Sequence, residues 1–596
     1  MITPMTRYSF ILLSGEQEGF LKELQELGLV DITRSVKPVD EGTSSLLARA
    51  ERLSGLIQEL DRLELPAEGQ SVPVEGNLAE AARTLLERHD SLTEALKAAN
   101  KDIAVRKSWG AFNPEAFRTL EEMGYKVHFH VCESKAFRKE WAEEYALQPV
   151  SEEGGLVRFV VIGEDTLPGE VNAPQADVRE AEQRKAELLK EDAAVLSKLR
   201  YIHEHVSELE AEKTSALSSL DLALASAAAA PAAENTVVTL EGYCPTECEE
   251  AVTAFIEKTG VFYLKEAARA EQNPPISFRN NKFVKMFEVL TDMYGRPTYD
   301  GFDPTPFLSV FFLLFFAMCM GDAGYGLVLI LIGLGMKKMD GFKDMSPLVT
   351  TLGIGTLVIG FWFHTFFSVD ISKWAVFENV QWLFLPPHLF GLEYDAAMVL
   401  SLIVGVVHIC LALIVKTAIA TKQKGLVGSL GTWGWTLLIV GGVIVAAFSL
   451  AGVMDSAVTR IVVIALGIVS ALGIFVFNDI HRNPLLNIGA GLWDTYNTAT
   501  GLLGDVLSYL RLYALGLAGA MLGYAFNDLG LMVLGDGGIG EWIGFIAVVV
   551  VGHALNIAMC ALGAFVHPLR LNFLEFFKNS GYEGAGRNFN PLQKQQ

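Results

Sequence analysis

Two arginines near the carboxyl end of the sequence lie inside long apolar segments, where charged residues are rare. Arg511 stands in SYLRLYALGLAG (508–519), close to the middle of an apolar run over 497–526, and Arg570 ends the last apolar run, 542–570. An arginine at the centre of a membrane helix costs about 2.5–3.5 kcal/mol on insertion scales. Arg511 therefore needs a functional or structural reason to be there.

The chemistry that arginine offers in such a place is a fixed positive charge. Its pKa stays above about 12, so it cannot carry protons. At about 4 Å and an effective dielectric constant of about 20, it would stabilise a facing carboxylate by about 4 kcal/mol, equivalent to about three pKa units. A protonated carboxyl group that arrives from lipid would therefore release its proton beside Arg511.

No carboxylate of this sequence is plainly paired with Arg511. Asp494 and Asp505 precede it on the same predicted helix or its lead-in, and Asp322 lies far away in the sequence. We therefore expect the partner carboxylate to belong to another subunit. Small residues on or near the face of Arg511 would let another helix approach closely. They are Gly504, Ser508, Gly516, Ala518, Gly519 and Gly523. The alternative is ordinary packing of this glycine-rich surface within the chain.

The carboxyl half has the pattern of a multi-span membrane domain. Apolar runs long enough to cross a hydrocarbon core of about 30 Å occupy 346–368, 396–419, 426–451, 459–477, 497–526 and 542–570. A further run, 306–336, is interrupted by GDAGYG (321–326) and predicts two short helices. The sequence thus predicts an α-helical polytopic membrane domain over 301–596 with about eight transmembrane helices.

The placement of positive charge supports an even number of spans. Ten Lys or Arg residues fall in the segments that eight spans place on one side, whereas the opposite loops hold only Lys373 and Arg460. Because positively charged loops stay in the cytoplasm, the soluble half and the carboxyl terminus are both expected there, with the protein in the cell membrane. The amino-terminal YSFILL is too short for a secretory signal.

The amino half, 1–300, is predicted to be a cytoplasmic α+β stalk domain with long coiled-coil arms. Apolar residues at heptad spacing predict arms over 45–104 and 176–213. Strand-like and helical segments predict small α/β lobes over 105–175 and 236–275. The Ala/Pro-rich stretch 223–235 has the composition of a linker.

Composition and motif content exclude several classes of function. The 596 residues carry a net charge of −22, and residues 304–596 hold only 14 of the 47 Lys and Arg and 16 of the 69 Asp and Glu. The amino half is thus strongly acidic, which argues against a nucleic-acid partner. The absence of a P-loop motif excludes that mode of ATP binding. The six cysteines are scattered, so we predict no zinc site and no disulfide framework, and His128 and His130 have no third ligand in view. We expect no cofactor and no metal.

Three long motifs follow one another along the sequence. They are FDPTPFLSVFFLLFFAMCMGDAGYGL (302–327), GDVLSYLRLYALGLAGAMLGYAFN (504–527) and VHPLRLNFLEFFKNSGYEGAGRNFNP (566–591). Together they resemble the a/I-subunit family, the membrane stator subunit of V-type and A/V-type rotary ATPases, in its short prokaryotic form. The resemblance extends over the whole chain, including the two-armed stalk, the TLEGYCP lobe and the join 282–306.

The resemblance implies a mechanism and a set of partners. In that family two arginines, matched here by Arg511 and Arg570, face a rotating proteolipid (c/K-type) ring and separate two aqueous half-channels for protons or sodium ions. The arms would link to peripheral-stalk subunits (E/G-type), and a central-stalk connector subunit (d/C-type) is a further expected partner beside the lipid bilayer. ATP chemistry takes place on other subunits, so this chain is expected to be non-catalytic. From spacing alone, Arg570 could instead snorkel to the interface.

The sequence departs from the eukaryotic pattern of this family at three positions. Asn497 and Cys560 stand where glutamates are usual, and Gly519 stands where a histidine is usual. Other polar residues are therefore the candidates for the half-channels. They are Asp494, Asp505, Ser508, His553, Asn556 and His567. Four small residues are expected to face the ring, namely Gly504, Gly516, Gly519 and Gly523.

Two other classes of function compete with this one. A secondary ion transporter with a cytoplasmic regulatory stalk would be expected to carry an internal repeat, and none is visible in the sequence. A membrane-anchored sensor or scaffold would have no need of Arg511 within the membrane.

Overall fold

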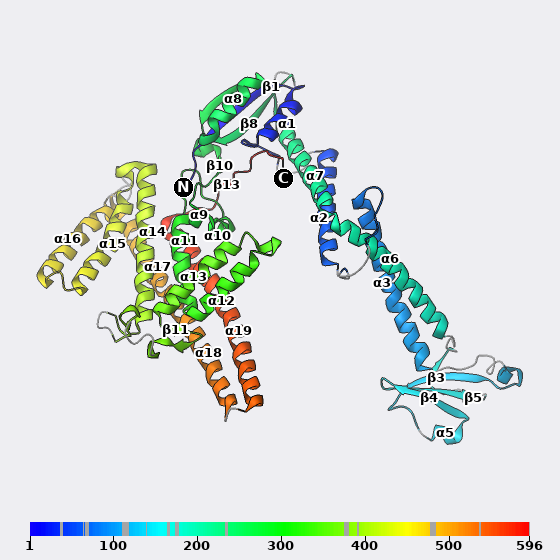
Figure 1. Cartoon of the computed structure of the whole chain (residues 1–596). Coiled ribbons are helices and arrows are strands. Elements are labelled where there is room, and N and C mark those ends of the chain that lie inside the picture. Colours follow the sequence, from blue (N-terminus) through cyan, green and yellow to red (C-terminus); the bar gives the residue numbers. More distant parts are fainter. Residues whose placement is uncertain are drawn as a thin grey trace. The chain divides into compact units, whose positions relative to one another are not determined.

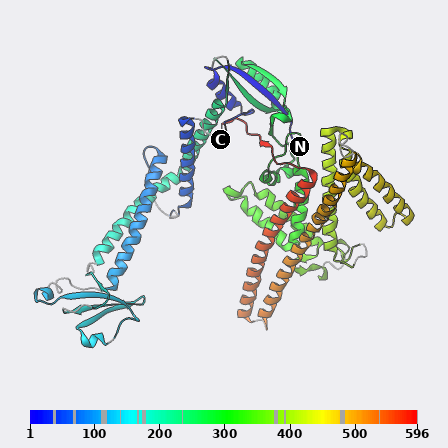
Figure 2. The ribbon, with the colours of Figure 1, turned by 180° about the vertical axis from the view of Figure 1, so that it is seen from behind.

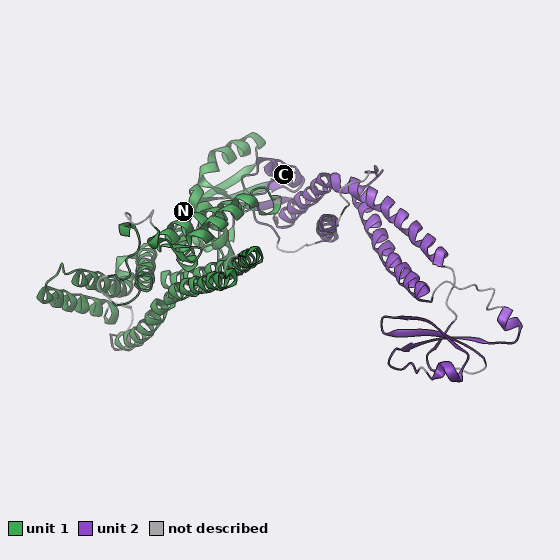
Figure 3. Ribbon diagram, turned by 60° about the horizontal axis from the view of Figure 1, so that its bottom comes forward, with its two compact units in different colours: residues 1–11, 29–32, 241–591 green, residues 12–28, 33–240, 592–596 purple. Residues whose placement is uncertain are grey.

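The computed structural model divides the chain into two compact units (Figure 3). Unit 1 comprises residues 1–11, 29–32 and 241–591, and unit 2 comprises 12–28, 33–240 and 592–596. The structure describes residues 1–35, 40–63, 65, 71–109, 119–138, 140–163, 167–172, 178–232, 236–374, 381–389, 393–476, 484–535 and 538–594. Unit 1 thus holds nearly all of the apolar carboxyl half.

Unit 2 is built around antiparallel pairs of long helices (Figure 1). α2 (Glu41–Arg62) packs against α7 (Val206–Ala227), and α3 (Leu78–Ser108) packs against α6 (Val178–Glu204). The short α1 (Gln17–Leu27) also packs against α7. Leucines and isoleucines at helical spacing form the buried core of these pairs, and ion pairs such as Arg49–Glu212 and Arg88–Glu191 join their edges. The predicted arms are therefore helical and paired.

A four-stranded sheet lies between α3 and α6 in the sequence. Its strands follow the order β4-β5-β3-β6, with β3 antiparallel to β5 and to β6. The elements are β3 (Val127–Glu133), α5 (Trp141–Glu144), β4 (Leu147–Glu153), β5 (Leu156–Ile162) and β6 (Glu170–Val171). His128 contacts Glu170, and His130 stacks on Phe159. No cluster of three metal-ligating side chains occurs among the described residues. Parts of the lobe predicted over 105–175, including 110–118, fall outside the described residues.

Unit 1 begins with a small α/β lobe that joins the amino terminus to residues 241–276. The strand order is β2-β8-β1-β9; β7 and the start of β8, which pair with each other, belong to unit 2. The elements are β1 (Met5–Leu13), β2 (Asp31–Ile32), β7 (Ala230–Ala232), β8 (Val237–Pro245), a 3₁₀ turn (Thr246–Cys248), α8 (Glu249–Thr259) and β9 (Phe262–Ala267). The lobe predicted over 236–275 is therefore completed by strands from the amino terminus.

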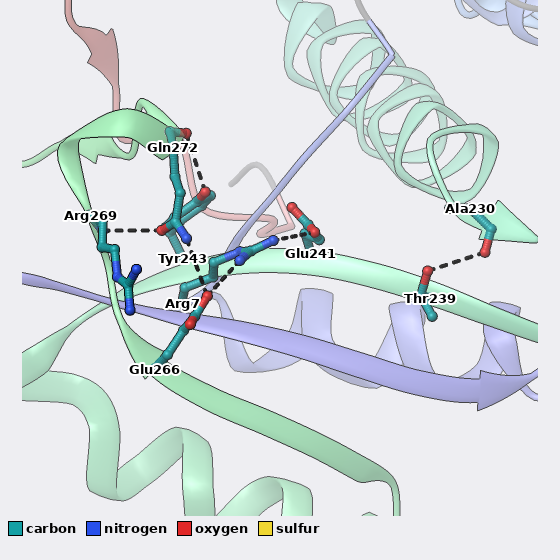
Figure 4. Close-up of polar contacts among 8 residues, drawn as sticks. All are labelled: Arg7, Ala230, Thr239, Glu241, Tyr243, Glu266, Arg269 and Gln272. Atoms are coloured by element: carbon teal, nitrogen blue, oxygen red, sulfur yellow. Dashed lines mark hydrogen bonds and ion pairs between the residues drawn. The ribbon is translucent and has the colours of Figure 1, made fainter.

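An arginine ties the strands of this lobe together (Figure 4). Arg7 on β1 forms ion pairs with Glu241 on β8 and, at 2.5 Å, with Glu266 on β9. Gln272 donates a hydrogen bond of 3.2 Å to the same Glu266 carboxylate. Opposite charges on neighbouring strands stabilise strand pairing.

The segments that lead into and out of the apolar helices lie together. β10 (Pro275–Ile276) pairs in parallel with β13 (Arg587–Asn588), and the hydroxyl of Tyr582 donates to the carbonyl of Gly295 at 2.7 Å. The short α9 (Lys282–Lys285) and α10 (Glu288–Tyr294) precede the first apolar helix. The bundle of apolar helices is thus entered and left at the same end.

Every apolar run expected from the sequence forms a helix. Three are short: α11 (Thr305–Met320), α12 (Ala323–Met336) and α13 (Ser346–Trp362). The others are α14 (Ala396–Gly428), α15 (Leu430–Leu450), α16 (Ser456–Phe475), the pair α17 (Pro484–Ser508) and α18 (Leu510–Leu534), and α19 (Ile539–Arg570), followed by a π-helix (Leu571–Phe576) and α20 (Phe577–Ser580). In the described part of the chain, five helical stretches have the length and composition to cross a membrane. The number of eight crossings remains a prediction.

The break predicted at GDAGYG lies between α11 and α12. Gly321 ends α11 in the left-handed conformation, with φ of 55°, which glycine adopts without strain. Asp322 caps α12 by accepting the backbone N–H groups of Gly324 and Tyr325. The same carboxylate also accepts the N–H groups of Phe367 and Ser368, beside the hairpin of β11 (Thr365–Phe366) and β12 (Val369–Asp370). One buried side chain therefore fixes both a helix start and a loop.

Candidate functional site

Arg511 follows a break between two collinear helices. α17 ends at Ser508, Tyr509 forms a turn, and α18 begins at Leu510. The Arg511 side chain is half-buried, and its Nη1 nitrogen is buried with no hydrogen-bond acceptor among the residues that the structure describes. A buried guanidinium nitrogen without an acceptor is unfavourable. The expectation that the partner carboxylate of Arg511 belongs to another subunit stays a prediction.

Arg570 ends α19 at an irregular point of the helix. Pro568 lies inside α19, and the six residues after Arg570 form a π-helix, an irregularity that is frequent at functional sites. The Arg570 side chain is exposed and extends an apolar row on the same helix face. That row consists of Leu555, Met559, Leu562 and Val566. Both arginines act electrostatically on His567, so the two positive charges belong to one region of the α18–α19 pair.

A polar cavity of about 440 Å³ lies on the α17 side of Arg511. It is lined by α14, α15, α17 and α20, and it brings together the predicted Asp494 and Asp505 with Asn497. Asp505 accepts a hydrogen bond from the Asn579 side chain at 2.8 Å, and Lys578 lies 3.5 Å away. Polar walls and this volume allow the cavity to hold several water molecules.

A second cavity, of about 400 Å³, lies on the other side of Arg511 along the same helix. Residues 512–520 of α18 line it, together with the ends of α11 and α13 and the start of α14. Its polar groups include His364 and Asp395, which accepts a hydrogen bond of 3.4 Å from Tyr513. Arg511 therefore stands, along the α17–α18 pair, between the stretches that line two separate cavities.

Two of the predicted polar residues belong to a buried hydrogen-bonded cluster. His553 contacts the Tyr325 hydroxyl through Nδ1 at 2.7 Å and the side-chain oxygen of Asn527 through Nε2 at 2.9 Å. Asn556 donates to the Tyr325 hydroxyl at 2.8 Å and to the Gly519 carbonyl at 2.9 Å. This cluster lies between α12, α18 and α19, on the side of Arg511 toward the α18–α19 turn.

Two of the four glycines expected to face a ring pack inside the chain instead. Helices α18 and α19 run side by side in both ribbon views (Figures 1 and 2). A Cβ atom at Gly519 would lie 2.6 Å from Cys560 Sγ, and one at Gly523 would lie 2.0 Å from Ser368 Oγ. The expectation of a ring-facing role is therefore corrected for Gly519 and Gly523, because their missing side chains admit neighbours of the same chain.

The other two glycines differ from this pair and from each other. A Cβ atom at Gly516 would lie 2.9 Å from the Met318 carbonyl, so Gly516 packs against α11 at the edge of the second cavity. Gly504 has nothing within 4 Å and remains open to a partner. The alternative of packing within the chain thus holds for most of this glycine-rich surface.

Comparison with known proteins agrees with this arrangement. The model of the V-type ATPase 116kDa subunit family matches residues 180–345 and 499–594, which include Asp322, the α17–α18 break, both arginines and the carboxyl tail. The chain belongs to the V-type ATPase 116kDa subunit family. The resemblance seen in the three sequence motifs is confirmed.

Members of this family from archaea and bacteria resemble the chain to different extents. It is 29% identical to the A-type ATP synthase subunit I of Methanocaldococcus jannaschii over 393 residues, 59% of this chain and 54% of that one. It is 25% identical to the V-type ATP synthase subunit I 1 of Treponema pallidum over an alignment that covers all of both chains. The matched region thus spans about half the length of the archaeal relatives.

A solved structure also matches part of the chain. It is the crystal structure of the cytoplasmic N-terminal domain of subunit I, homolog of subunit a, of V-ATPase. The match covers 45% of this chain and all of that one, with 16% identity and a TM-score of 0.17. A TM-score this low establishes no common arrangement of the elements.

In this member of the V-type ATPase 116kDa subunit family, one buried carboxylate escaped the sequence reasoning. Glu575, in the π-helix after Arg570, is only 4% exposed and lies within hydrogen-bonding reach of Ser508. It also acts electrostatically with Asp505 and Arg570. Its signal in the sequence is a lone acidic residue inside LNFLEFF, five positions after the arginine. Tyr325 was missed as well, because only the fold brings it to His553.

Proposed function

We propose that the chain is the non-catalytic membrane stator subunit of a V/A-type rotary ATPase, and that it forms the ion path against a rotating proteolipid (c/K-type) ring. The observation that carries the proposal is the half-buried Arg511, whose Nη1 has no acceptor in the described part of the chain, between two cavities. Such a positive charge stabilises the ionised form of a carboxylate of another subunit when that carboxylate passes it. ATP hydrolysis or synthesis then belongs to other subunits.

The two cavities have different roles in this proposal. The cavity with Asp494, Asp505 and Asn497 is the half-channel toward the cytoplasm, and Ser508 with Glu575 extends it toward the arginines. The cavity beside Gly516 and the cluster of His553 and Asn556 form the half-channel toward the outside. Arg511 prevents ions from passing directly between them, because a fixed positive charge repels cations in a low dielectric. His567 lies between the arginines as a polar neighbour.

The surface left open near the arginines fits a ring of helices. An added Cβ atom at Gly504 would meet nothing within 4 Å, and the row that ends at Arg570 is exposed in the described part of the chain. An apolar row with one terminal cation suits a neighbour that is apolar except for one carboxylate. Arg570 would then hold the ring carboxylate after it has passed Arg511.

The helices and the paired entry and exit segments support a topology in the membrane. We propose eight crossings, formed by α11, α12, α13, α14, α15, α16, the α17–α18 pair and α19. An even number agrees with the pairing of β10 with β13, which keeps the two ends of the bundle together. α12 has 14 residues and is about 21 Å long, so it crosses only where the membrane is locally thin. Residues 1–300 and the carboxyl terminus would then lie in the cytoplasm of a cell with this protein in its membrane.

The helices α2, α3, α6 and α7, which lie in the arms predicted over 45–104 and 176–213, are proposed to act as coiled-coil levers. They would bind peripheral-stalk subunits (E/G-type), while the lobe near the membrane would meet the central-stalk connector (d/C-type). Holding the membrane subunit against rotation requires such a rigid link. The antiparallel packing of α3 on α6 supports rigidity.

The test is ATP-driven ion uptake into vesicles that carry the assembled complex. Native protein is compared with Arg511→Ala and Arg511→Lys, with complex assembly and ATP hydrolysis measured on the same samples. The proposal expects uptake of protons or sodium ions to be lost in both variants while the complex stays intact, because lysine lacks the delocalised fork of arginine. Uptake near the native rate in both variants would reject the proposal.

A further inference from the structure

His408 is a buried polar residue that the proposed ion path does not include. It lies on α14 and is 0% exposed. Its ring is stacked between Phe311, at 4.1 Å between centroids, and Phe576, at 4.6 Å with nearly parallel planes. Its Nδ1 nitrogen is 2.9 Å from the hydroxyl of Tyr509. One imidazole thus makes both a directional hydrogen bond and two stacking contacts.

The hydrogen bond leads to the helix break beside Arg511. Tyr509 is the turn residue between α17 and α18, two positions before Arg511, and it is 0% exposed. Its ring fits against α14 only because Gly405, one turn before His408, has no side chain. A Cβ atom there would lie 2.3 Å from the Tyr509 ring. Tyr509 is therefore held by α14 through shape and through His408.

The stacking contact leads to the segment after Arg570. Phe576 is the last residue of the π-helix that begins at Leu571, directly after Arg570. It is fully buried, and its stacking on His408 fixes the rotation of that irregular turn against α14. His408 therefore touches both chain segments that carry the arginines.

We infer that His408 is a positioning residue that sets the separation of Arg511 and Arg570 by joining Tyr509 to Phe576. The inference rests on the proposed function, in which both arginines meet one moving carboxylate. Neither segment is regular at its contact with His408, because one is a helix break and the other a π-helix. Irregular backbone persists only where the surrounding structure holds it, so contacts from outside these segments are needed to fix them.

The chemistry of the side chain argues for this role over simple packing. His408 Nε2 is buried without a hydrogen-bond partner in the part of the chain that the structure describes. A phenylalanine in the same place would keep the stacking and would remove this unfavourable buried nitrogen. The gain from histidine is the directional bond to Tyr509, and buried polar contacts of this kind favour one arrangement over its alternatives.

The expected effect follows from the distance dependence of the arginine–carboxylate interaction. Loss of the hydrogen bond lets the helix break at Tyr509 rotate. If the distance between Arg511 and the ring carboxylate then grows from about 4 Å to about 6 Å, their attraction weakens by about tenfold in equilibrium constant at an effective dielectric constant of about 20. Ion uptake per ATP hydrolysed would fall by a similar factor. Assembly and thermal stability would change far less, because the packing around His408 is kept.

The experiment measures ATP-driven ion uptake per ATP hydrolysed in vesicles that carry the assembled complex. His408→Phe keeps the ring and removes the hydrogen bond, and Tyr509→Phe removes the same bond from the other side. The double variant combines them. Ser401→Ala, which removes a buried hydroxyl from the same helix α14 with its bond to the Met398 carbonyl, is the matched control. Arg511→Lys is run in parallel.

The inference expects each single variant to lower uptake per ATP about tenfold, the double variant to lower it no further, and Ser401→Ala to leave it unchanged. Equal effects of singles and double would place both residues in one interaction. Native uptake in His408→Phe and Tyr509→Phe, with uptake lost in Arg511→Lys, would overturn the inference and leave the proposed function intact. Native uptake in Arg511→Lys as well would reject the proposed function. If His408→Phe does not assemble, Tyr509→Phe alone decides.

Discussion

Replacing Asp322 should remove more stability than the loss of an ordinary helix cap. The Asp322 carboxylate is 4% exposed and accepts four backbone N–H groups, those of Gly324, Tyr325, Phe367 and Ser368, at 2.5 to 3.2 Å. A hydrogen bond to a charged group contributes about 1.5–3 kcal/mol, and a buried donor left unpaired costs about 1–3 kcal/mol. Asp322→Ala leaves all four donors without this acceptor.

The magnitude can be bounded from this geometry. If water replaces the acceptor for two of the four donors after the change, two hydrogen bonds to a charged group are lost without replacement, and Asp322→Ala lowers the free energy of unfolding by about 3–6 kcal/mol. Asp322→Asn keeps one acceptor oxygen, which serves Gly324, Tyr325 and Phe367, but it presents an NH₂ group to the Ser368 N–H. We expect a loss of about 2–3 kcal/mol for Asp322→Asn, because one donor then faces another donor.

The assay is thermal and denaturant unfolding of the purified chain in detergent, with Asp455→Ala as the matched control. Asp455 also caps a helix, α16, but it is exposed, and in the described part of the chain its side chain accepts the Ser456 N–H alone. Its replacement should lower stability by about 1 kcal/mol or less. The expected order is Asp322→Ala, then Asp322→Asn, then Asp455→Ala. Equal losses in Asp322→Ala and Asp455→Ala would refute the account of Asp322 as a buried acceptor for four donors.

Three further outcomes follow from the structure. Gly523→Ala should destabilise the α18–α19 pair by about 1–3 kcal/mol, because the added methyl group overpacks against Ser368. Gly504→Ala, where no atom lies near, should leave stability unchanged. Equal melting temperatures of the two variants would contradict this difference. A hydrogen bond from Arg7 lowers the pKa of Glu266, and one from Lys265 lowers the pKa of Glu249. The two ion pairs therefore stabilise the lobe above about pH 4.5, and this stabilisation is lost as the pH falls through the lowered pKa values. Hydrogen-exchange protection of β1 and β9 should therefore be weakened by Arg7→Gln at pH 6 but hardly at pH 3, and an equal effect at both would argue against the ion pairs. Burial raises the pKa of Cys244 to about 12, so a maleimide at pH 8 should label the partly exposed Cys248 much faster, and equal rates would show that Cys244 is accessible.

Local patterns of the sequence were sufficient for most of the helices. Apolar runs of membrane length, a Gly-Asp break and heptad spacing depend on neighbouring residues alone, and α11 and α12 meet at the expected Gly321–Asp322. The arginines also stand out from the sequence, because a charge within an apolar run is conspicuous. These features require no knowledge of tertiary contacts.

The contacts around the arginines could not be read in the same way. Glu575 and Ser508 come together only through the π-helix, and a π-helix leaves no hydrophobic period to detect. The glycines of α18 were assigned to a partner because spacing alone does not distinguish two helices of one chain from two subunits. Gly519 and Gly523 turned out to face Cys560 and Ser368, which lie far away in the sequence.

The proposed function requires that Arg511 separates two cavities that open to opposite sides of the membrane. The most direct measurement is labelling by a membrane-impermeant thiol reagent in vesicles of known orientation, with Asn497→Cys and Ala520→Cys introduced separately into a chain without its native cysteines. Asn497 lines the cavity with Asp505, and Ala520 lines the cavity with Asp395. We predict that Asn497→Cys reacts only from the cytoplasmic side and Ala520→Cys only from the outside. Reaction of both cysteines from the same side would contradict the account.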